Sequence, residues 1–320
     1  MDTTVLSRTA AAMAALTLLA VVPACASQQQ LAASPAPTAD EVANMDYQGI
    51  EEAGGTVALR DGRWEGMPYA EGGASRPRVR IVPDSLATGD LDDDGNAEAV
   101  VLLSSSSGGS GTRSSVAVIA RRDGRARNVA TRLLGDRVQV RSLTVKDGLL
   151  TIDVVRAGPD DAACCPGELA TYRWTLGAAG LGDARPPVVS GRLSASTLEG
   201  SDWVLRRFAY DEDAPAAPVV TLAFGGGQLR GTAGCNHYFA AISDKADGAA
   251  GAISLGPIAS TQKMCPDPDM AVDDRYLRQL GSVSRFGYMN GRLMLDYEGG
   301  VMLFDRADDP TQNAVTGQLP

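Results

Sequence analysis

Three dipeptides constrain the fold of this chain more than any other feature. Asp123-Gly124, Asp147-Gly148 and Asn290-Gly291 each lie between short runs rich in Val, Ile, Leu and Thr. Asp-Gly and Asn-Gly tolerate the positive φ angles of a tight two-residue turn, so each predicts an antiparallel β-hairpin. Only 5% of residues are aromatic, while 36 are Gly and 17 are Pro, which also favours turn-rich β structure over long helices.

The expected elements form two groups, so the chain is predicted to be mainly β (α+β), with two small antiparallel β domains. In the first domain, residues 41–176, the expected strands are Val79–Val82, Ala97–Leu103, Ser115–Ala120, Val138–Val145, Leu149–Val155 and Ala170–Leu176. In the second, residues 198–306, they are Trp203–Phe208, Val219–Phe224, Gln228–Thr232, Ile253–Leu255, Arg285–Met289, Arg292–Leu295 and Val301–Phe304. One helix is expected at Asp269–Leu280, capped by Asp267 or Asp269, with an apolar face of Met270, Tyr276, Leu277 and Leu280.

Two segments are expected to lie outside these domains. Residues 177–197 are rich in Gly, Ala and Pro and contain Pro186-Pro187, which predicts a linker. Residues 307–320 are expected to be a frayed tail.

The N-terminus has the pattern of an export signal. Arg8 precedes the nearly uncharged run Ala10–Val22. This run is shorter than the roughly 20 residues that span a bilayer, so residues 1–24 are expected to be a removable signal peptide.

The end of the signal, Val22-Pro23-Ala24-Cys25, resembles a lipobox, although Pro23 departs from the usual residue. The resemblance implies a diacylated Cys25, and two acyl chains give stable membrane attachment. Residues 25–40 would then be a disordered tether, and the protein would be extracytoplasmic and lipid-anchored in the cell envelope. With two membranes, Ala26 resembles the outer-membrane sorting pattern. The alternative is cleavage at the A-x-A sequence Ala24-Cys25-Ala26, which would release a soluble protein.

An acidic stretch directly before one expected strand has the spacing of a calcium loop. Asp90, Asp92, Asp94, Asn96 and Glu98 follow the pattern D-x-D-x-D-G-x-x-[DE], which resembles the loops of dockerins, EF-hands and integrin-type propellers. Calcium requires six to eight oxygen ligands, and alternate carboxylates in a tight turn can converge. Val101 stands where an EF-hand has a bidentate Glu, so the propeller type is the better comparison. The alternative is an acidic surface turn.

The cysteines favour an oxidising compartment. With Cys25 assigned to lipid, Cys164, Cys165, Cys235 and Cys265 remain, an even number with three possible connectivities. A Cys235–Cys265 disulfide is favoured because both lie in one predicted domain. Cys164 and Cys165 would then form a vicinal disulfide or remain two thiols.

Two motifs in the second domain carry a family resemblance. Gly231-Thr-Ala-Gly-Cys-Asn236 is followed by Thr261-Gln-Lys-Met-Cys265, and together with the flanking strands they resemble the META domain of the HslJ-like heat-shock lipoproteins. The resemblance implies a mostly β fold with stress- or secretion-related associations and no known substrate. Gly231 and Gly234 would allow a tight backbone path, and Asn236 would hydrogen-bond its own turn.

These features together predict a non-enzymatic envelope protein. His237 is the only histidine, and no G-x-S-x-G elbow is present. The net charge of −10 argues against nucleic acid as a partner. The expected role is a binding or stress-related module that contacts an envelope protein or small ligand through loops such as Ser104–Thr112. The alternatives are a passive structural component and a thiol-redox protein using Cys164 and Cys165.

Overall fold

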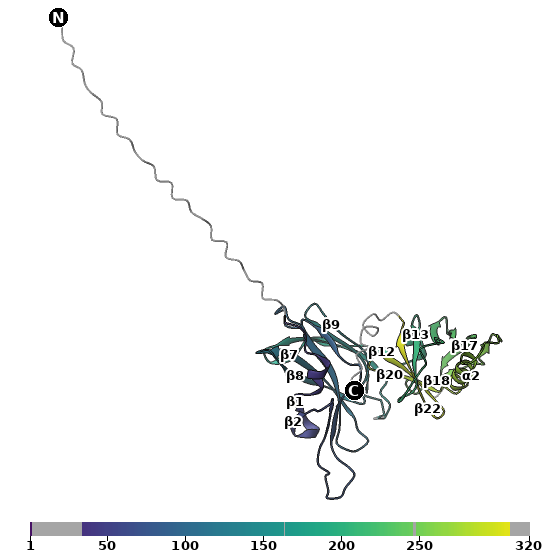
Figure 1. Cartoon of the computed structure of the whole chain (residues 1–320), viewed down its shortest axis with the longest axis horizontal. Coiled ribbons are helices and arrows are strands. Elements are labelled where there is room, and N and C mark those ends of the chain that lie inside the picture. Colours follow the sequence, from purple (N-terminus) through teal and green to yellow (C-terminus); the bar gives the residue numbers. More distant parts are fainter. Residues whose placement is uncertain (2–33, 163, 246–247, 308–320) are drawn as a thin grey trace. The chain divides into compact units, whose positions relative to one another are not determined.

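The computed structural model describes Met1 and residues 34–162, 164–245 and 248–307 (Figure 1). Apart from Met1, the predicted signal peptide lies outside these residues, as do Cys25, the first part of the predicted tether and nearly all of the predicted tail. None of the described helices is both long and apolar enough to cross a membrane.

A six-stranded antiparallel sheet forms the centre of the N-terminal block, in the order β3-β4-β6-β7-β8, with β5 beside β6. Its strands are β3 (Arg63–Glu65), β4 (Arg78–Ile81), β5 (Ala87–Gly89), β6 (Glu98–Ser106), β7 (Arg113–Arg122) and β8 (Arg125–Asp136). Six consecutive residues are buried in both β6 and β7. Because both faces of these strands are covered, their sequences are continuous apolar runs rather than alternating ones.

A four-stranded sheet covers one face of the central sheet, in the order β12-β11-β10-β9. Its strands are β9 (Gln139–Lys146), β10 (Leu149–Arg156), β11 (Glu168–Gly177) and β12 (Gly180–Arg192). The core between the two sheets includes Val100, Leu102, Val116, Val118, Leu150, Ile152, Val154 and Trp174. On the other face lie α1 (Ala39–Ala43), β1 (Asp46–Ile50), η1 (Glu51–Ala53) and β2 (Gly55–Ala58), and Tyr47 and Ile50 are buried there.

The linker prediction is wrong for most of its length. Gly180–Arg192 is strand β12, which pairs with β11, and Ala195–Leu198 is the short helix η2. Because β12 is an edge strand, it tolerates Pro186 and Pro187, which donate no backbone hydrogen bond. Nearly all of its residues are exposed, so no apolar alternation marks it as a strand.

All three predicted hairpin turns are present. Both residues of Asp123-Gly124, Asp147-Gly148 and Asn290-Gly291 have positive φ. The loop expected at Ser104–Thr112 is shorter, because β6 continues to Ser106. Strand β8 was missed, since its sequence mixes Arg, Asn and Thr with apolar residues and most of its side chains are only half-buried.

The C-terminal block is one ten-stranded sheet in the order β18-β17-β16-β15-β13-β22-β21-β20, with β14 beside β13 and β19 beside β17. The strands are β13 (Asp202–Ala209), β14 (Glu212–Asp213), β15 (Thr221–Gly225), β16 (Gln228–Thr232), β17 (His237–Asp244), β18 (Ile253–Leu255), β19 (Ala259–Ser260), β20 (Arg285–Met289), β21 (Arg292–Tyr297) and β22 (Gly300–Arg306). A bridge between Ala252 and Arg285 joins the two ends, so the sheet is nearly closed, like a barrel.

Helix α2 spans Asp269–Leu280, as predicted, and buries Val272, Asp273, Tyr276 and Leu280. The capping prediction is wrong. Pro268 occupies the N-cap and provides no side-chain hydrogen bond, because Asp267 lies one residue too early and Asp269 is already helical.

Order begins before the predicted domain start at residue 41. Thr38 caps α1 in a capping box with Glu41, and the Pro35 carbonyl accepts a 2.8 Å hydrogen bond from Arg121 Nε. The last residues of the predicted tether are therefore part of the folded block.

Candidate functional site

The acidic loop connects β5 to β6. Gly95, at φ +83°, allows the chain to turn, and its N–H donates to Asp90 Oδ2 at 2.9 Å. The loop ends at Glu98, the first residue of β6, whose side chain is only 1% exposed. One Glu98 oxygen accepts a 2.8 Å hydrogen bond from the Leu91 N–H, which fixes the carboxylate beneath the loop.

Three of the five predicted ligands converge. Asp90, Asp92 and Glu98 each offer a carboxylate oxygen, and these three atoms lie within 4.8 Å of one another. Asp90 Oδ1 and Asp92 Oδ1 are buried with no hydrogen-bond partner among the described residues. A buried carboxylate oxygen without a donor is costly, so this arrangement fits a cation better than it fits a simple surface turn.

The electrostatics of Glu98 agree with this geometry. Burial raises the pKa of the Glu98 carboxyl, and the carboxylates of Asp92, Asp94 and Asp90 raise it further, while the Leu91 N–H opposes the shift. A calcium ion would neutralise this concentration of negative charge with the hard oxygen ligands that it prefers.

The other two predicted ligands lie differently. Asp94 Oδ1 accepts hydrogen bonds from the backbone and side-chain nitrogens of Asn96, at 2.8 and 2.9 Å. Asn96 Oδ1 in turn accepts from the Ser34 N–H. Arg122, which no sequence pattern indicated, forms ion pairs with Asp92 at 3.0 Å and with Asp94 at 3.7 Å. Asp94 and Asn96 therefore shape the loop rather than join the carboxylate cluster.

A buried polar cluster lies in the C-terminal block where the two sequence motifs meet. Asp273 of α2 is 2% exposed, and its carboxylate accepts from the backbone N–H groups of Cys235 and Asn236, at 3.1 and 2.7 Å. The Asn236 side-chain amide donates a third hydrogen bond to it at 3.2 Å. The helix thereby holds the turn after β16.

Asn236 also joins this turn to the second motif. Its Oδ1 accepts from Thr261 Oγ1 and from the Lys263 N–H, both at 2.8 Å. The prediction that this side chain bonds within its own turn is therefore wrong: it links two distant segments. Gly231 has the predicted tight path, since a Cβ there would lie 2.0 Å from the Thr221 carbonyl oxygen.

The disulfide favoured by the sequence is present, and of the two alternatives left open for Cys164 and Cys165 the structure has the vicinal pair. Cys235 and Cys265 are disulfide-bonded, with Cα atoms 6.0 Å apart. Cys164 and Cys165 form a vicinal pair with Cα atoms 3.8 Å apart. The Cys235–Cys265 disulfide connects the turn after β16 to the segment before α2.

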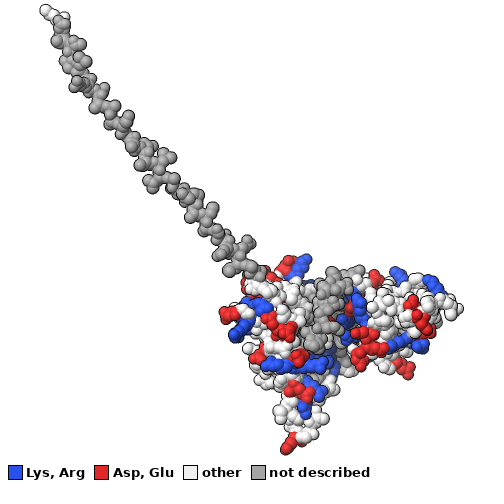
Figure 2. Space-filling model, viewed as in Figure 1, with Lys and Arg blue, Asp and Glu red and all other residues white. Residues whose placement is uncertain are grey.

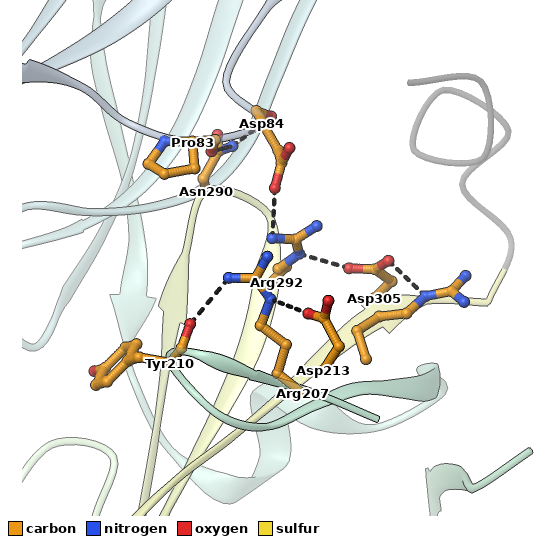
Figure 3. Close-up of polar contacts among 9 residues, drawn as sticks. Pro83, Asp84, Arg207, Tyr210, Asp213, Asn290, Arg292 and Asp305 are labelled. Carbon is orange, nitrogen blue, oxygen red and sulfur yellow. Dashed lines mark hydrogen bonds and ion pairs between the residues drawn. The ribbon is translucent and has the colours of Figure 1, made fainter. Parts of the chain in front are cut away.

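Ion pairs link the loop before β5 to the C-terminal sheet (Figure 3). Arg292 contacts Asp84 and Asp305, both at 2.7 Å, and Asp305 also pairs with Arg206 at 2.7 Å. The Asn290 amide donates to the carbonyls of Pro83 and Asp84. Figure 3 shows these side chains meeting between strands from distant parts of the sequence.

Comparison with known proteins identifies the C-terminal block. The sequence model of the META domain matches residues 196–309. The C-terminal block is a META domain. The Asp273–Asn236 cluster lies within the META domain, whereas the acidic loop lies outside it.

An NMR structure of a protein from Burkholderia xenovorans is 24% identical to this chain, covers 40% of it and 99% of its own length, and has a TM-score of 0.31. No curated protein matches the chain.

Sequence reasoning missed Asp273, although a signal was present. Asp273 precedes Tyr276 by three residues and Leu280 by seven, so it lies on the apolar stripe of a helix where a carboxylate must find buried donors. Arg122 and Arg292 carried no comparable signal, because their partners depend on tertiary contacts.

Proposed function

We propose that this protein is a non-enzymatic, lipid-anchored module of the cell envelope that binds an envelope partner and whose N-terminal block is stabilised by calcium. The META domain supports the stress-related and envelope part of this proposal. The lipobox-like sequence ending at Cys25 and the disulfide-bonded cysteines support an extracytoplasmic, oxidising location.

The carboxylate cluster carries the calcium part of the proposal. Asp90, Asp92 and Glu98 would supply three ligands, and the two buried oxygens without donors would gain a partner. Backbone carbonyls and water would complete a shell of six to eight oxygens. The role proposed for the ion is to hold the β5–β6 loop, which begins the most buried strand of the block.

The proposed non-catalytic role is supported by the position of the single histidine, the residue type most often used for acid–base catalysis. His237, the single histidine of the sequence, begins β17 in an exposed position. Its backbone N–H donates to Thr261 Oγ1, so the start of β17 is positioned by the second META motif, residues 261–265.

The calcium proposal is tested by thermal unfolding of the full-length chain carrying Cys25→Ser, in millimolar calcium and in chelator. A ligand at 100 times its Kd adds about 2.7 kcal/mol to the free energy of unfolding. We expect calcium to raise the melting temperature, and Asp92→Asn to abolish the increase.

Asp93→Asn is the matched control. Asp93 is exposed, lies next to Asp92, is outside the carboxylate cluster and has a φ of +57° that Asn tolerates well. Its calcium response should equal that of the parent. An absent response in the parent, or equal losses in both variants, would refute the calcium site.

The lipid part has a separate test. Mass spectrometry of the membrane fraction should show a diacylated N-terminal cysteine at position 25, and Cys25→Ser should release the protein from the membrane. A parent chain that starts at Ser27 would contradict lipidation and support the soluble alternative.

A further inference from the structure

An arginine-rich groove lies at the free edge of the central sheet, away from the acidic loop. Its volume is about 640 Å³. Its lining includes Arg63 and Glu65 of β3, Arg78 and Arg80 of β4, and Ser104 and Ser106 of β6. Gly108, Gly109 and Thr112 of the β6–β7 loop also line it.

Strand register aligns these side chains on one face. Arg63 pairs with Arg80, which pairs in turn with Ser104, while Glu65 pairs with Arg78, which pairs with Ser106. Side chains directly opposite one another on adjacent strands have Cβ atoms about 4.5–5.5 Å apart. This face continues from the apolar positions Val100 and Leu102, and it turns polar where the second sheet no longer covers it.

The charge in the groove is only partly neutralised. Glu65 is shared by Arg76 at 2.8 Å and Arg78 at 3.1 Å. Within the described part of the chain, neither Arg63 nor Arg80 has a carboxylate within 4.0 Å. Two like charges directly opposite across strands destabilise a sheet. The Arg63–Arg80 pair therefore lowers the stability of the fold when no anion is bound. It is a local concentration of positive charge in a chain whose net charge is −10. Figure 2 shows positive and negative side chains interspersed on the face of the molecule that it draws.

Serine hydroxyl groups and a glycine-containing loop line the groove beside the arginines. Ser106 Oγ accepts from the Gly108 N–H at 3.2 Å, so its own proton is free to be donated. Ser75 Oγ donates to the Gly108 carbonyl at 3.1 Å and fastens the β6–β7 loop to the groove rim. A Cβ at Gly108 would lie 2.9 Å from the backbone of Arg76, so the rim tolerates no side chain there.

We propose that this groove binds a phosphate group, with Arg63 and Arg80 as the paired anion ligands and Ser104 and Ser106 as hydroxyl donors. Guanidinium groups form bidentate, charge-assisted hydrogen bonds with phosphate oxygens. A phosphate between the two arginines would also remove their mutual repulsion. The inference rests on the proposed binding function and names its ligand class. The source of the phosphate is a phospholipid headgroup or a soluble phosphate ester.

The test measures binding of inorganic pyrophosphate by calorimetry, and binding to vesicles of phosphatidylglycerol or phosphatidylcholine by sedimentation. The protein is the full-length chain with Cys25→Ser. Pyrophosphate binding points to a soluble ester, and binding only to phosphatidylglycerol vesicles points to a headgroup; either result supports the groove. The double variant R63Q/R80Q should weaken that binding at least ten-fold. Arg230→Gln, which matches the charge change of either single substitution at an exposed position of β16, should leave it unchanged.

A second readout separates binding from folding. Without ligand, Arg80→Gln should unfold at the same or a higher temperature than the parent, because it removes a like-charge pair. With pyrophosphate or phosphatidylglycerol, only the parent should gain stability. The proposal is overturned by absent binding in both arms, or by equal losses in R63Q/R80Q and Arg230→Gln. The calcium dependence of the melting temperature does not depend on phosphate binding. The calcium proposal and the phosphate proposal can therefore be refuted independently.

Discussion

Removing the disulfide between Cys235 and Cys265 should destabilise the META domain by an amount that follows from the chain it closes. The two cysteines are 30 residues apart. In the chain-entropy description, a cross-link closing about 30 residues removes about 12 cal/mol/K from the unfolded state, or about 3.6 kcal/mol at 25 °C. The double variant Cys235→Ala/Cys265→Ala should lose about this much free energy of unfolding.

Hydrogen exchange followed by mass spectrometry can assign this loss to the correct block. Peptides from β16, β17 and α2 report on the META domain, and peptides from β6 and β7 report on the N-terminal block. A loss of about 3.6 kcal/mol corresponds to about 400-fold less protection, since about 1.36 kcal/mol is a factor of ten. Protection in β6 and β7 should change far less.

The vicinal cysteines provide the matched control. Cys164→Ser/Cys165→Ser also removes a disulfide, but the two residues are adjacent and close no chain segment. In the Cys164→Ser/Cys165→Ser variant, peptides of the META domain should exchange at the same rate as in the parent. Addition of reductant to the parent should lower the protection of these peptides to the level of Cys235→Ala/Cys265→Ala. A change below ten-fold on removing the long-range disulfide would refute the reasoning, because the turn would then be ordered without the cross-link.

Three further variants test the packing described above by chemical denaturation. Gly231→Ala should cost about 2–3 kcal/mol, because its Cβ would lie 2.0 Å from the Thr221 carbonyl oxygen and must push two paired strands apart; a neutral result would contradict that contact. Asp273→Ala should cost about 3 kcal/mol by leaving buried donors unsatisfied, whereas the exposed Asp274→Ala should cost less than about 0.5. Arg121 hydrogen-bonds Glu41 and lowers its pKa from 4.5 to about 2, so this pair stabilises the fold above the unfolded pKa and is lost as pH falls towards 2. Glu41→Gln should therefore flatten the decline in stability between about pH 5 and pH 2, and an unchanged slope would exclude the pair as its source.

Local sequence rules located the elements that depend on local chemistry. The hairpin turns at Asp123-Gly124 and Asn290-Gly291 follow from positive φ, and the extent of α2 follows from its periodicity. Strand β12 could not be predicted, because its stability comes from pairing with β11 and its side chains are nearly all exposed. A sequence pattern cannot distinguish such a strand from a linker rich in Gly and Pro.

The candidate site divides in the same way. Spacing brought Asp90, Asp92 and Glu98 together in prediction and in structure. It could not show that Asp94 would bond Asn96, or that β7 would bring Arg122 against the loop. The arginine groove was not predicted at all, because β3 and β4 are separated by a loop whose course the sequence does not specify.

The boundary of the META match is not a boundary of packing. Val155, Leu169 and Leu193 precede residue 196, yet they are buried in the same core as Trp203, Tyr276 and Phe304. Burying one such side chain contributes about 1.5–3 kcal/mol. A fragment that starts at residue 196 loses all three, and it also loses Asp84, the partner of Arg292. The core of the META domain therefore depends on residues outside the family match, and the linker prediction failed at the segment that supplies one of them. Strand β12 forms the edge of the four-stranded sheet, and Leu193, directly after it, is buried in the core of the C-terminal block.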